Sequence, residues 1–285
     1  MTRPRPAPFV PPSARRRAPG GRARLWVATL ALLAAVPGRA SDELPPPAGA
    51  DSAAVARDTL AASPEPFHAG ESLRFAVQYG FIHAGSAWLE VPEVVDWNGK
   101  PCWRLVARAE SNSFFDHVYR VRNRIESLWD ENGHFSWRYF EDRHEGHFHA
   151  NDTIAFDTTG HFARYKNGDT LSVPFLAQDA LSAFYYTRFQ ALPVGGSIVF
   201  DYHASRKSSP LEVRVLGREQ IKTPAGRFNC VVIEPILKAG GIFKNNGRLV
   251  IWLTDDARRM PVLMRSKVVV GSISVVLQEA RAGTS

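Results

Sequence analysis

A two-residue alternation of apolar and polar side chains, broken by turn signals about every ten residues, restricts the fold most. The first such segment starts at Glu71, with apolar residues at 73, 75, 77 and 79. Turn signals such as Asn98-Gly99 and Asn167-Gly168 separate the segments. Successive side chains of a strand point to opposite faces, so each segment predicts a half-buried strand. The repeated short strands predict a mainly β fold built from antiparallel hairpins.

The predicted strands lie on both sides of a single helical segment. Their ranges are 71–79, 86–97, 103–109, 120–129, 135–142, 147–156, 161–165, 198–203, 211–216, 218–223, 228–237, 249–254, 261–270 and 273–277. Residues 114–119 are aromatic and irregular and fit one helical turn, and residues 239–247 predict a glycine-rich loop.

Residues 178–192 form the one convincing amphipathic helix of the predicted domain. Its apolar side chains recur at helical spacing on one face. They are Leu181, Phe184, Tyr185, Phe189 and Leu192. Asp179 is a predicted N-cap, and Pro193 followed by Gly195-Gly196 predicts the end of the helix. So heavy an apolar face must be buried against the sheet.

These patterns predict one β-rich domain over residues 67–281, followed by a short tail at 282–285. The fold is a curved antiparallel sheet or a pair of half-barrels, with helix 178–192 packed on the concave side. The domain is long enough for one sizeable core or two half-cores. Residues 41–66 are rich in Pro and Ala and predict a disordered or semi-rigid linker.

The first 40 residues predict a secretory signal peptide. An Arg-rich start precedes an apolar run over residues 25–36, shorter than the ~20 residues of a membrane-spanning helix. Gly38-Arg39-Ala40 then supplies small residues for cleavage after Ala40. An uncleaved anchor is the alternative, and no transmembrane helix is expected in the mature chain. The predicted location is the periplasm or the exterior.

The net charge of +7 belongs to this N-terminal segment. Residues 1–40 hold eight Arg and no acidic residue, so 27 basic and 28 acidic residues remain after cleavage. A chain of that balance has no electrostatic basis for binding nucleic acid.

Two cysteines, Cys102 and Cys230, remain in the predicted domain. An oxidising compartment would permit one disulfide between them. Both lie in apolar strand-like segments, where a free Cys is also an ordinary small core residue. The sequence leaves the two alternatives open.

Motifs of known catalysts are absent: the sequence holds no G-x-S-x-G, P-loop or G-x-G-x-x-G pattern. In a strand starting at residue 147, His147 and His149 would share one face and could hold a metal. The alternative is the solvent face beside a turn, and we expect no cofactor. Asp255-Asp256 could be an acid/base pair, but the following Ala-Arg-Arg favours a capped turn.

The polar residues of the helix are the remaining candidates for a ligand site. Arg188 interrupts the apolar face and should pair with a carboxylate or a carbonyl, unless its charged end reaches solvent. Ser182, Tyr185 and Tyr186 lie around it. A group of aromatic residues could line a cavity for a lipid or another apolar ligand, or could form a packed core. The group is Trp88, Trp103, Trp129, Trp137 and Phe140.

An ordered set of motifs resembles the bacterial family known as domain of unknown function 3108. They are F-H-A-G-E-S-L-R-F at 67–75, G-x-I-x-A-G at 80–85, Q-D-A-L-S-A-F-Y-Y-T-R at 178–188, T-P-A-G-R-F at 223–228 and I-W-L-T-D-D-A-R-R-M-P-V at 251–262. The resemblance implies an exported protein and brings no catalytic residues. The C-terminal segment is remotely similar to periplasmic lipoprotein carriers of the Lol type, which hold acyl chains within a curved antiparallel sheet.

The expected function is therefore non-enzymatic. An exported protein would bind an apolar or lipid-like ligand, or assist envelope assembly, and could lie peripheral to the envelope. An envelope hydrolase with scattered catalytic residues and a structural scaffold are the alternatives. The oligomeric state stays open.

Overall fold

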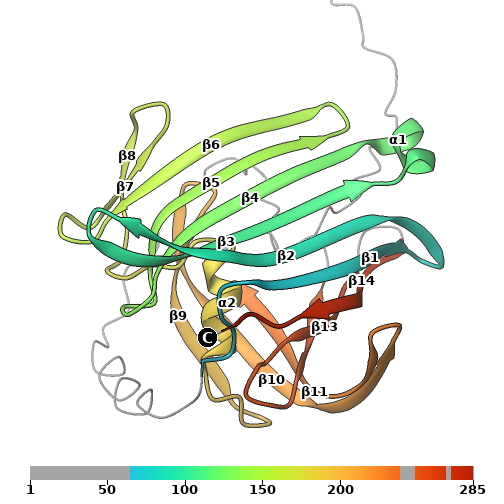
Figure 1. Ribbon diagram of the computed structural model, residues 1–285. Coiled ribbons are helices and arrows are strands. Elements are labelled where there is room, and N and C mark those ends of the chain that lie inside the picture. Colours follow the sequence, from blue (N-terminus) through green and yellow to red (C-terminus); the bar gives the residue numbers. More distant parts are fainter. Residues whose placement is uncertain (1–64, 238–247, 268–270, 285) are drawn as a thin grey trace, which may run out of the picture.

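The computed structural model describes residues 65–237, 248–267 and 271–284. The strands of this part of the chain form one 14-stranded sheet in the order β8-β7-β6-β5-β4-β3-β2-β1-β14-β13-β12-β11-β10-β9. Neighbouring strands are antiparallel throughout. The sheet is strongly curved (Figure 1). The predicted fold class, a curved antiparallel sheet with a packed helix, is confirmed.

The N-terminal half of the sheet holds eight strands and one short helix. They are β1 (Glu71–Tyr79), β2 (Ile82–Trp97), β3 (Lys100–Ser111), α1 (Ser113–Tyr119), β4 (Val121–Asp130), β5 (Ser136–Glu145), β6 (Phe148–Asp157), β7 (Phe162–Tyr165) and β8 (Thr170–Ser172). The C-terminal half follows helix α2 (Ser182–Arg188). Its strands are β9 (Ser197–Ala204), β10 (Lys207–Thr223), β11 (Gly226–Leu237), β12 (Leu249–Thr254), β13 (Pro261–Lys267) and β14 (Ser272–Arg281).

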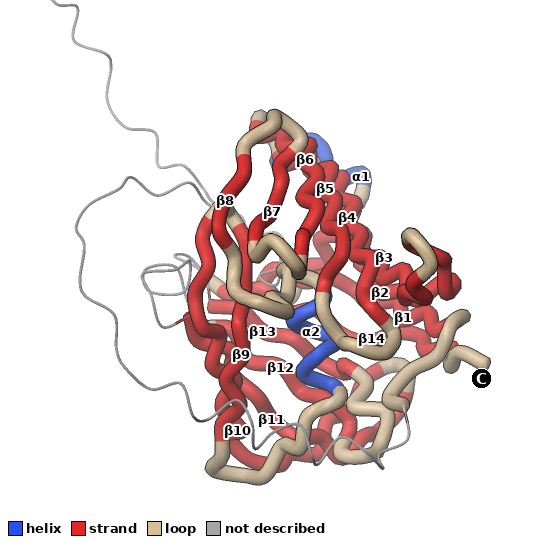
Figure 2. Tube along the Cα trace, turned by 90° about the vertical axis from the view of Figure 1, so that its left-hand side faces the viewer, coloured by secondary structure: helices blue, strands red, loops and turns tan. Residues whose placement is uncertain are grey.

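The path of the chain places α2 between the two halves of the sheet. The chain starts in the middle at β1, proceeds outward to β8, crosses to the opposite edge at β9 and returns inward to β14. β14 then pairs with β1, which joins the two halves. α2 belongs to the crossover, and Figure 2 shows it enclosed by the curved sheet.

Most predicted strands are confirmed, because each alternates apolar and polar residues in its own sequence. Asn98 and Gly99 both have positive φ, 54° and 78°, as the predicted hairpin requires. The predicted break within residues 211–223 is wrong: β10 is one strand with an irregularity between Val215 and Gly217. The short strand β8 was missed.

The signal peptide, almost all of the linker, the loop at 239–247 and residues 268–270 lie outside the described residues.

The helix at 178–192 is confirmed in its position but not in its length. α2 covers only Ser182–Arg188. Gln178 instead forms an isolated parallel bridge with Tyr202 of β9. After the helix, Phe189 donates its backbone N–H to Tyr186, three residues back, which tightens the last turn. A tertiary bridge therefore replaces the first predicted helical turn, and a local tight turn replaces the last.

The main core lies between α2 and the inner face of the sheet. It draws buried residues from both halves, such as Phe75 of β1, Ile125 of β4 and Leu253 of β12. α2 contributes Phe184 and Tyr185 to the same cluster. The prediction that this helix packs its apolar face against the sheet is therefore confirmed.

Candidate functional site: an apolar hollow beside helix α2

One side of α2 borders a hollow in the C-terminal half of the molecule. The enclosed cavity is about 50 Å³, within a depression of about 480 Å³ that includes open solvent. Its lining comes from α2, the segment before it, and strands β9 to β12. The lining residues are Ala180, Ala183, Phe184, Thr187, Tyr202, Leu211, Val213, Ile233, Pro235, Leu237, Leu249 and Ile251. We call this space the hollow.

The walls of the hollow are almost entirely apolar. The Thr187 hydroxyl donates to the Ala183 carbonyl at 2.9 Å, so this hydrogen-bond donor is satisfied within the helix. Burial raises the pKa of the Tyr202 phenol, which keeps it uncharged. A lining of apolar side chains with a few polar groups is typical of small-ligand sites.

Small residues on one side of α2 make room for the hollow. Ala180, Ala183 and Thr187 recur at helical spacing, and each contributes to the lining. Larger side chains at these positions would fill the space. The sequence shows this stripe of small residues, and it was the signal that the sequence analysis missed.

The predicted polar site residues of the helix do not line the hollow. Ser182 is fully buried, and its hydroxyl lies 2.7 Å from the Ser136 hydroxyl of β5. Tyr185 is also fully buried, and its hydroxyl has no hydrogen-bond partner among the described residues. Tyr186 is half-buried and packs its ring on Phe200 of β9. These residues hold the helix against the sheet.

Arg188 forms a buried ion pair across the core. Its two terminal nitrogens donate to the two carboxylate oxygens of Glu71 in β1, at 2.7 and 2.8 Å. The carbonyls of Pro66 and Arg258 accept further hydrogen bonds from it at 3.1 and 3.0 Å. The prediction that Arg188 pairs with a carboxylate or a carbonyl is confirmed, and the alternative with an exposed guanidinium is wrong. The pair fixes the end of α2 to the middle of the sheet.

The start of α2 is fixed by a buried polar network around Asp179. One carboxylate oxygen accepts the backbone N–H groups of Leu181 and Ser182, both at 2.8 Å. The other accepts the Ser127 hydroxyl of β4 at 2.5 Å. Burial raises the pKa of the Asp179 carboxyl, although these hydrogen bonds favour its charged form. The N-cap itself is Leu181, two residues after the predicted Asp179, but the Asp179 carboxylate still accepts the N–H groups at the start of the helix.

The aromatic side chains of the N-terminal half form a packed core. Trp103 and Trp129 are buried with ring centroids 5.4 Å apart, and Phe67 lies 5.1 Å from Trp103. Trp88, Trp137 and Phe140 are half-buried, and none of them lines the hollow. For Trp103 and Trp129, the interpretation as a packed core is therefore the observed one.

Contacts between two hairpin turns bring the outer edges of the sheet together. The Tyr165 hydroxyl of β7 lies 2.7 Å from Nε2 of His203 in β9. Arg206, in the β9–β10 turn, pairs with Asp169 beside β8 and stacks over the Tyr165 ring at 4.4 Å. Burial lowers the pKa of His203 to about 4, and Arg206 adds to this effect. A neutral His203 therefore holds one edge of the sheet against the other.

The histidine pairing expected from the sequence is wrong in register. β6 begins at Phe148, so His147 lies in the preceding turn, exposed, and does not share a strand face with His149. His149 instead faces His144 of β5, with their Nδ1 atoms 2.8 Å apart. Among the described residues, no three His, Cys, Asp or Glu side chains gather as a metal site requires.

Neither the cysteines nor the paired aspartates form a reactive site. Cys102 and Cys230 are buried free thiols on β3 and β11, and burial raises the pKa of each. The two cysteines are therefore free core residues in this structure, and they do not form the disulfide. Asp255 and Asp256 make separate ion pairs, with Arg218 and Arg258, in the turn after β12. The capped-turn interpretation is the one observed.

One protein-family model matches nearly the whole sheet of this chain. The model of the family described as protein of unknown function DUF3108 matches residues 74–278. The chain belongs to this family. A search of curated proteins finds no match.

One solved structure shows the same type of fold at low sequence identity, and two others align with lower scores. A β-barrel-like protein of domain of unknown function 1849 from Brucella abortus aligns with a TM-score of 0.53 and 9% identity, over 75% of this chain and 98% of that chain. A protein provisionally described as a lipoprotein from Parabacteroides distasonis has a TM-score of 0.34 and 11% identity, over 77% and 100%. A similarly described exported protein with a YmcC-like fold from Bacteroides fragilis has a TM-score of 0.35 and 13% identity, over 77% and 99%. Neither helix in the described part of the chain has the length and apolar character of a membrane span.

Proposed function

We propose that this DUF3108 protein is exported and binds an apolar, lipid-like ligand in the hollow beside α2, without catalysing a reaction on it. The observation that carries the proposal is the nearly uniform apolar lining of the hollow, which opens to solvent beside α2. Removing apolar ligand surface from water contributes about 25 cal/mol per Å², so an acyl chain or a similar group would be stabilised there. The predicted signal peptide supports a role outside the cytoplasm.

Polar contacts at both ends fix the position of α2, as this role requires. The Arg188–Glu71 ion pair holds its end, and the Asp179 network holds its start. The face between these supports presents only Ala183, Phe184 and Thr187 to the hollow. The helix can thus remain in place whether the hollow is empty or filled.

A substitution that fills the hollow tests the proposal. Ala183→Phe adds an aromatic ring at the lining, and we expect it to weaken the binding of a fluorescent fatty-acid probe at least about tenfold. Ala155→Phe is the matched control, because Ala155 is exposed on β6 and lies outside the lining. Probe titration of the wild-type protein and both variants measures the effect, and circular dichroism checks that each is folded.

Val213→Phe, on the opposite wall, provides a second filling variant if Ala183→Phe does not fold. Unchanged probe affinity in a folded filling variant would contradict the proposal. Absence of probe binding by the wild-type protein would contradict it equally.

A further inference from the structure

Large apolar side chains are exposed together at one end of the sheet. Phe81 in the β1–β2 turn is 105% exposed, Phe114 and Val118 of α1 are each 68% exposed, and Ile82 is 55% exposed. Figure 1 shows α1 and the β1–β2 turn at the same end of the sheet. We call these four residues the apolar tip. Clustered exposed apolar side chains of this size mark an interaction surface.

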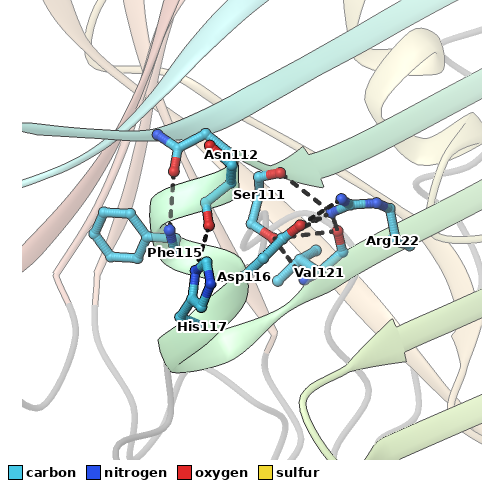
Figure 3. Close-up of polar contacts among 8 residues, drawn as sticks. Ser111, Asn112, Phe115, Asp116, His117, Val121 and Arg122 are labelled. Carbon is cyan, nitrogen blue, oxygen red and sulfur yellow. Dashed lines mark hydrogen bonds and ion pairs between the residues drawn. The ribbon is translucent and has the colours of Figure 1, made fainter.

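The polar face of α1 is held so firmly that its apolar face must point outward. Asn112 caps the helix by accepting the Phe115 N–H at 3.0 Å (Figure 3). Asp116 accepts two hydrogen bonds from Arg122 of β4, at 3.1 and 2.7 Å, and one from the Ser111 hydroxyl. Phe114 and Val118, four residues apart, lie on one face of the helix. Their exposure is therefore imposed by a fixed helix.

Further hydrogen bonds join α1 to the β1–β2 hairpin. The Asn112 side chain donates to the His83 carbonyl at 2.6 Å, and its backbone N–H donates to the Ala84 carbonyl at 2.9 Å. Gly80 donates its backbone N–H to Ser272 of β14 at 3.0 Å, which anchors the turn that carries Phe81. The two parts of the apolar tip are thus one rigid projection.

Exposed basic groups surround the tip. His83, His117 and Arg120 are exposed beside it, as is His147 of the β5–β6 turn. That turn borders α1, since the Gly146 N–H donates to the Arg120 carbonyl at 2.8 Å. Glu110 is exposed nearby, whereas Asp116 is occupied by Arg122. The Arg120 guanidinium and the imidazole N–H groups can donate hydrogen bonds to the phosphates of lipid headgroups.

The lining of the hollow extends toward the same rim of the sheet. Tyr79 pairs with Ile273, and Ser266 of β13 pairs with both Ile273 and Leu249. Leu249 belongs to the lining, as does Leu237 at the end of β11. The apolar tip and this part of the lining therefore lie at the same end of the strands. A lipid surface bound by the tip would be on the same side as that part of the hollow.

We propose that the apolar tip inserts into the headgroup region of an anionic lipid bilayer and attaches the protein to it reversibly. The projecting tip suits this partner, because separate side chains on a turn and a short helix can enter a fluid interface without a matching groove. The choice of a lipid surface rests in part on the proposed function. The tip itself is an independent observation.

Vesicle sedimentation with the purified, naturally processed protein tests the inference. We expect binding to phosphatidylglycerol-containing vesicles and weaker binding to pure phosphatidylcholine vesicles. Phe81→Ser and Phe114→Ser should each lower the partition coefficient about tenfold. The matched control is Phe175→Ser, since Phe175 is 50% exposed and follows β8, on the far side of the sheet from α1 (Figure 1).

Three results would overturn the inference. They are no binding to either vesicle, equal losses in the tip and control variants, and a tip-dependent dimer in place of vesicle binding. The filling variant Ala183→Phe separates this inference from the proposed function. It should bind vesicles like the wild-type protein while losing the fatty-acid probe.

Discussion

At the residue scale, the most informative side chain is Arg188. A buried guanidinium is costly unless its charge and its N–H groups are satisfied. Glu71 supplies both carboxylate oxygens, and the Phe67 ring lies 4.8 Å from the guanidinium carbon. The sequence predicted a partner for Arg188 because the residue interrupts an apolar helix face. It could not identify Glu71, which lies 117 positions away, because that contact depends on how the crossover places α2 against β1.

Breaking this pair should destabilise the protein strongly. Arg188→Met leaves the Glu71 carboxylate buried without its partner, and we expect a loss of about 3–5 kcal/mol in the free energy of unfolding. The double variant Arg188→Met/Glu71→Gln should lose less than the sum of the two single variants, because neither charge then remains. Urea unfolding of the wild-type protein, the two single variants and the double variant measures the coupling energy between the two residues.

Arg104→Met is the control for this cycle, because Arg104 is about one-third exposed and pairs with Glu93 and Glu126 near the surface. Such pairs contribute about 0–1 kcal/mol. A loss for Arg188→Met no larger than for Arg104→Met would show that the buried pair does not support α2.

At the element scale, the position of α2 followed from its local sequence and its length did not. Apolar residues at helical spacing predicted burial, and Phe184 and Tyr185 are buried as expected. The ends are set by distant groups, such as the bridge between Gln178 and Tyr202. The small residues Ala183 and Thr187 are visible in the sequence, but they leave space only where strands β9 to β12 face them, so they do not predict the hollow by themselves.

The capping carboxylate of α2 gives a prediction at this scale. Asp179→Ala removes the acceptor for two backbone N–H groups and for the Ser127 hydroxyl, and should cost about 2 kcal/mol of stability. Asp179→Asn keeps a carbonyl acceptor and should cost less. Thermal unfolding of both variants checks the order, and a larger loss for Asp179→Asn would contradict the capping role.

At the scale of the whole molecule, one continuous sheet curves until side chains near its two edges touch, although the edge strands do not pair. Alternation within each strand predicted this fold class, and the observed sheet agrees with it. The order of the strands was not predictable, because β1 pairs with β14 across the whole length of the domain. The contact of Tyr165 with His203 between the edges is equally non-local.

The edge contact should make stability depend on pH. The pKa of His203 is lowered to about 4 in the folded protein, against an ordinary value near 6.5. Between these values the unfolded chain binds more protons, so the stabilising effect of neutral His203 is present above pH 6.5 and is lost as the pH falls toward 4. The loss should be on the order of 2–3 kcal/mol.

His203→Gln isolates this effect, because other groups titrate in the same range. The wild-type protein should lose more stability than the variant between pH 6.5 and 4, as measured by urea unfolding at each pH. Parallel pH profiles for the two proteins would show that His203 is not held neutral at the edge contact.

The central claim is that the hollow beside α2 holds an apolar ligand, and native mass spectrometry of the exported protein tests it most directly. The account predicts a bound lipid-like mass on the wild-type protein and on Ala155→Phe, which is lost from folded Ala183→Phe. A wild-type protein that carries no such mass and gains none when incubated with lipid, or an Ala183→Phe variant that retains it, would contradict the account.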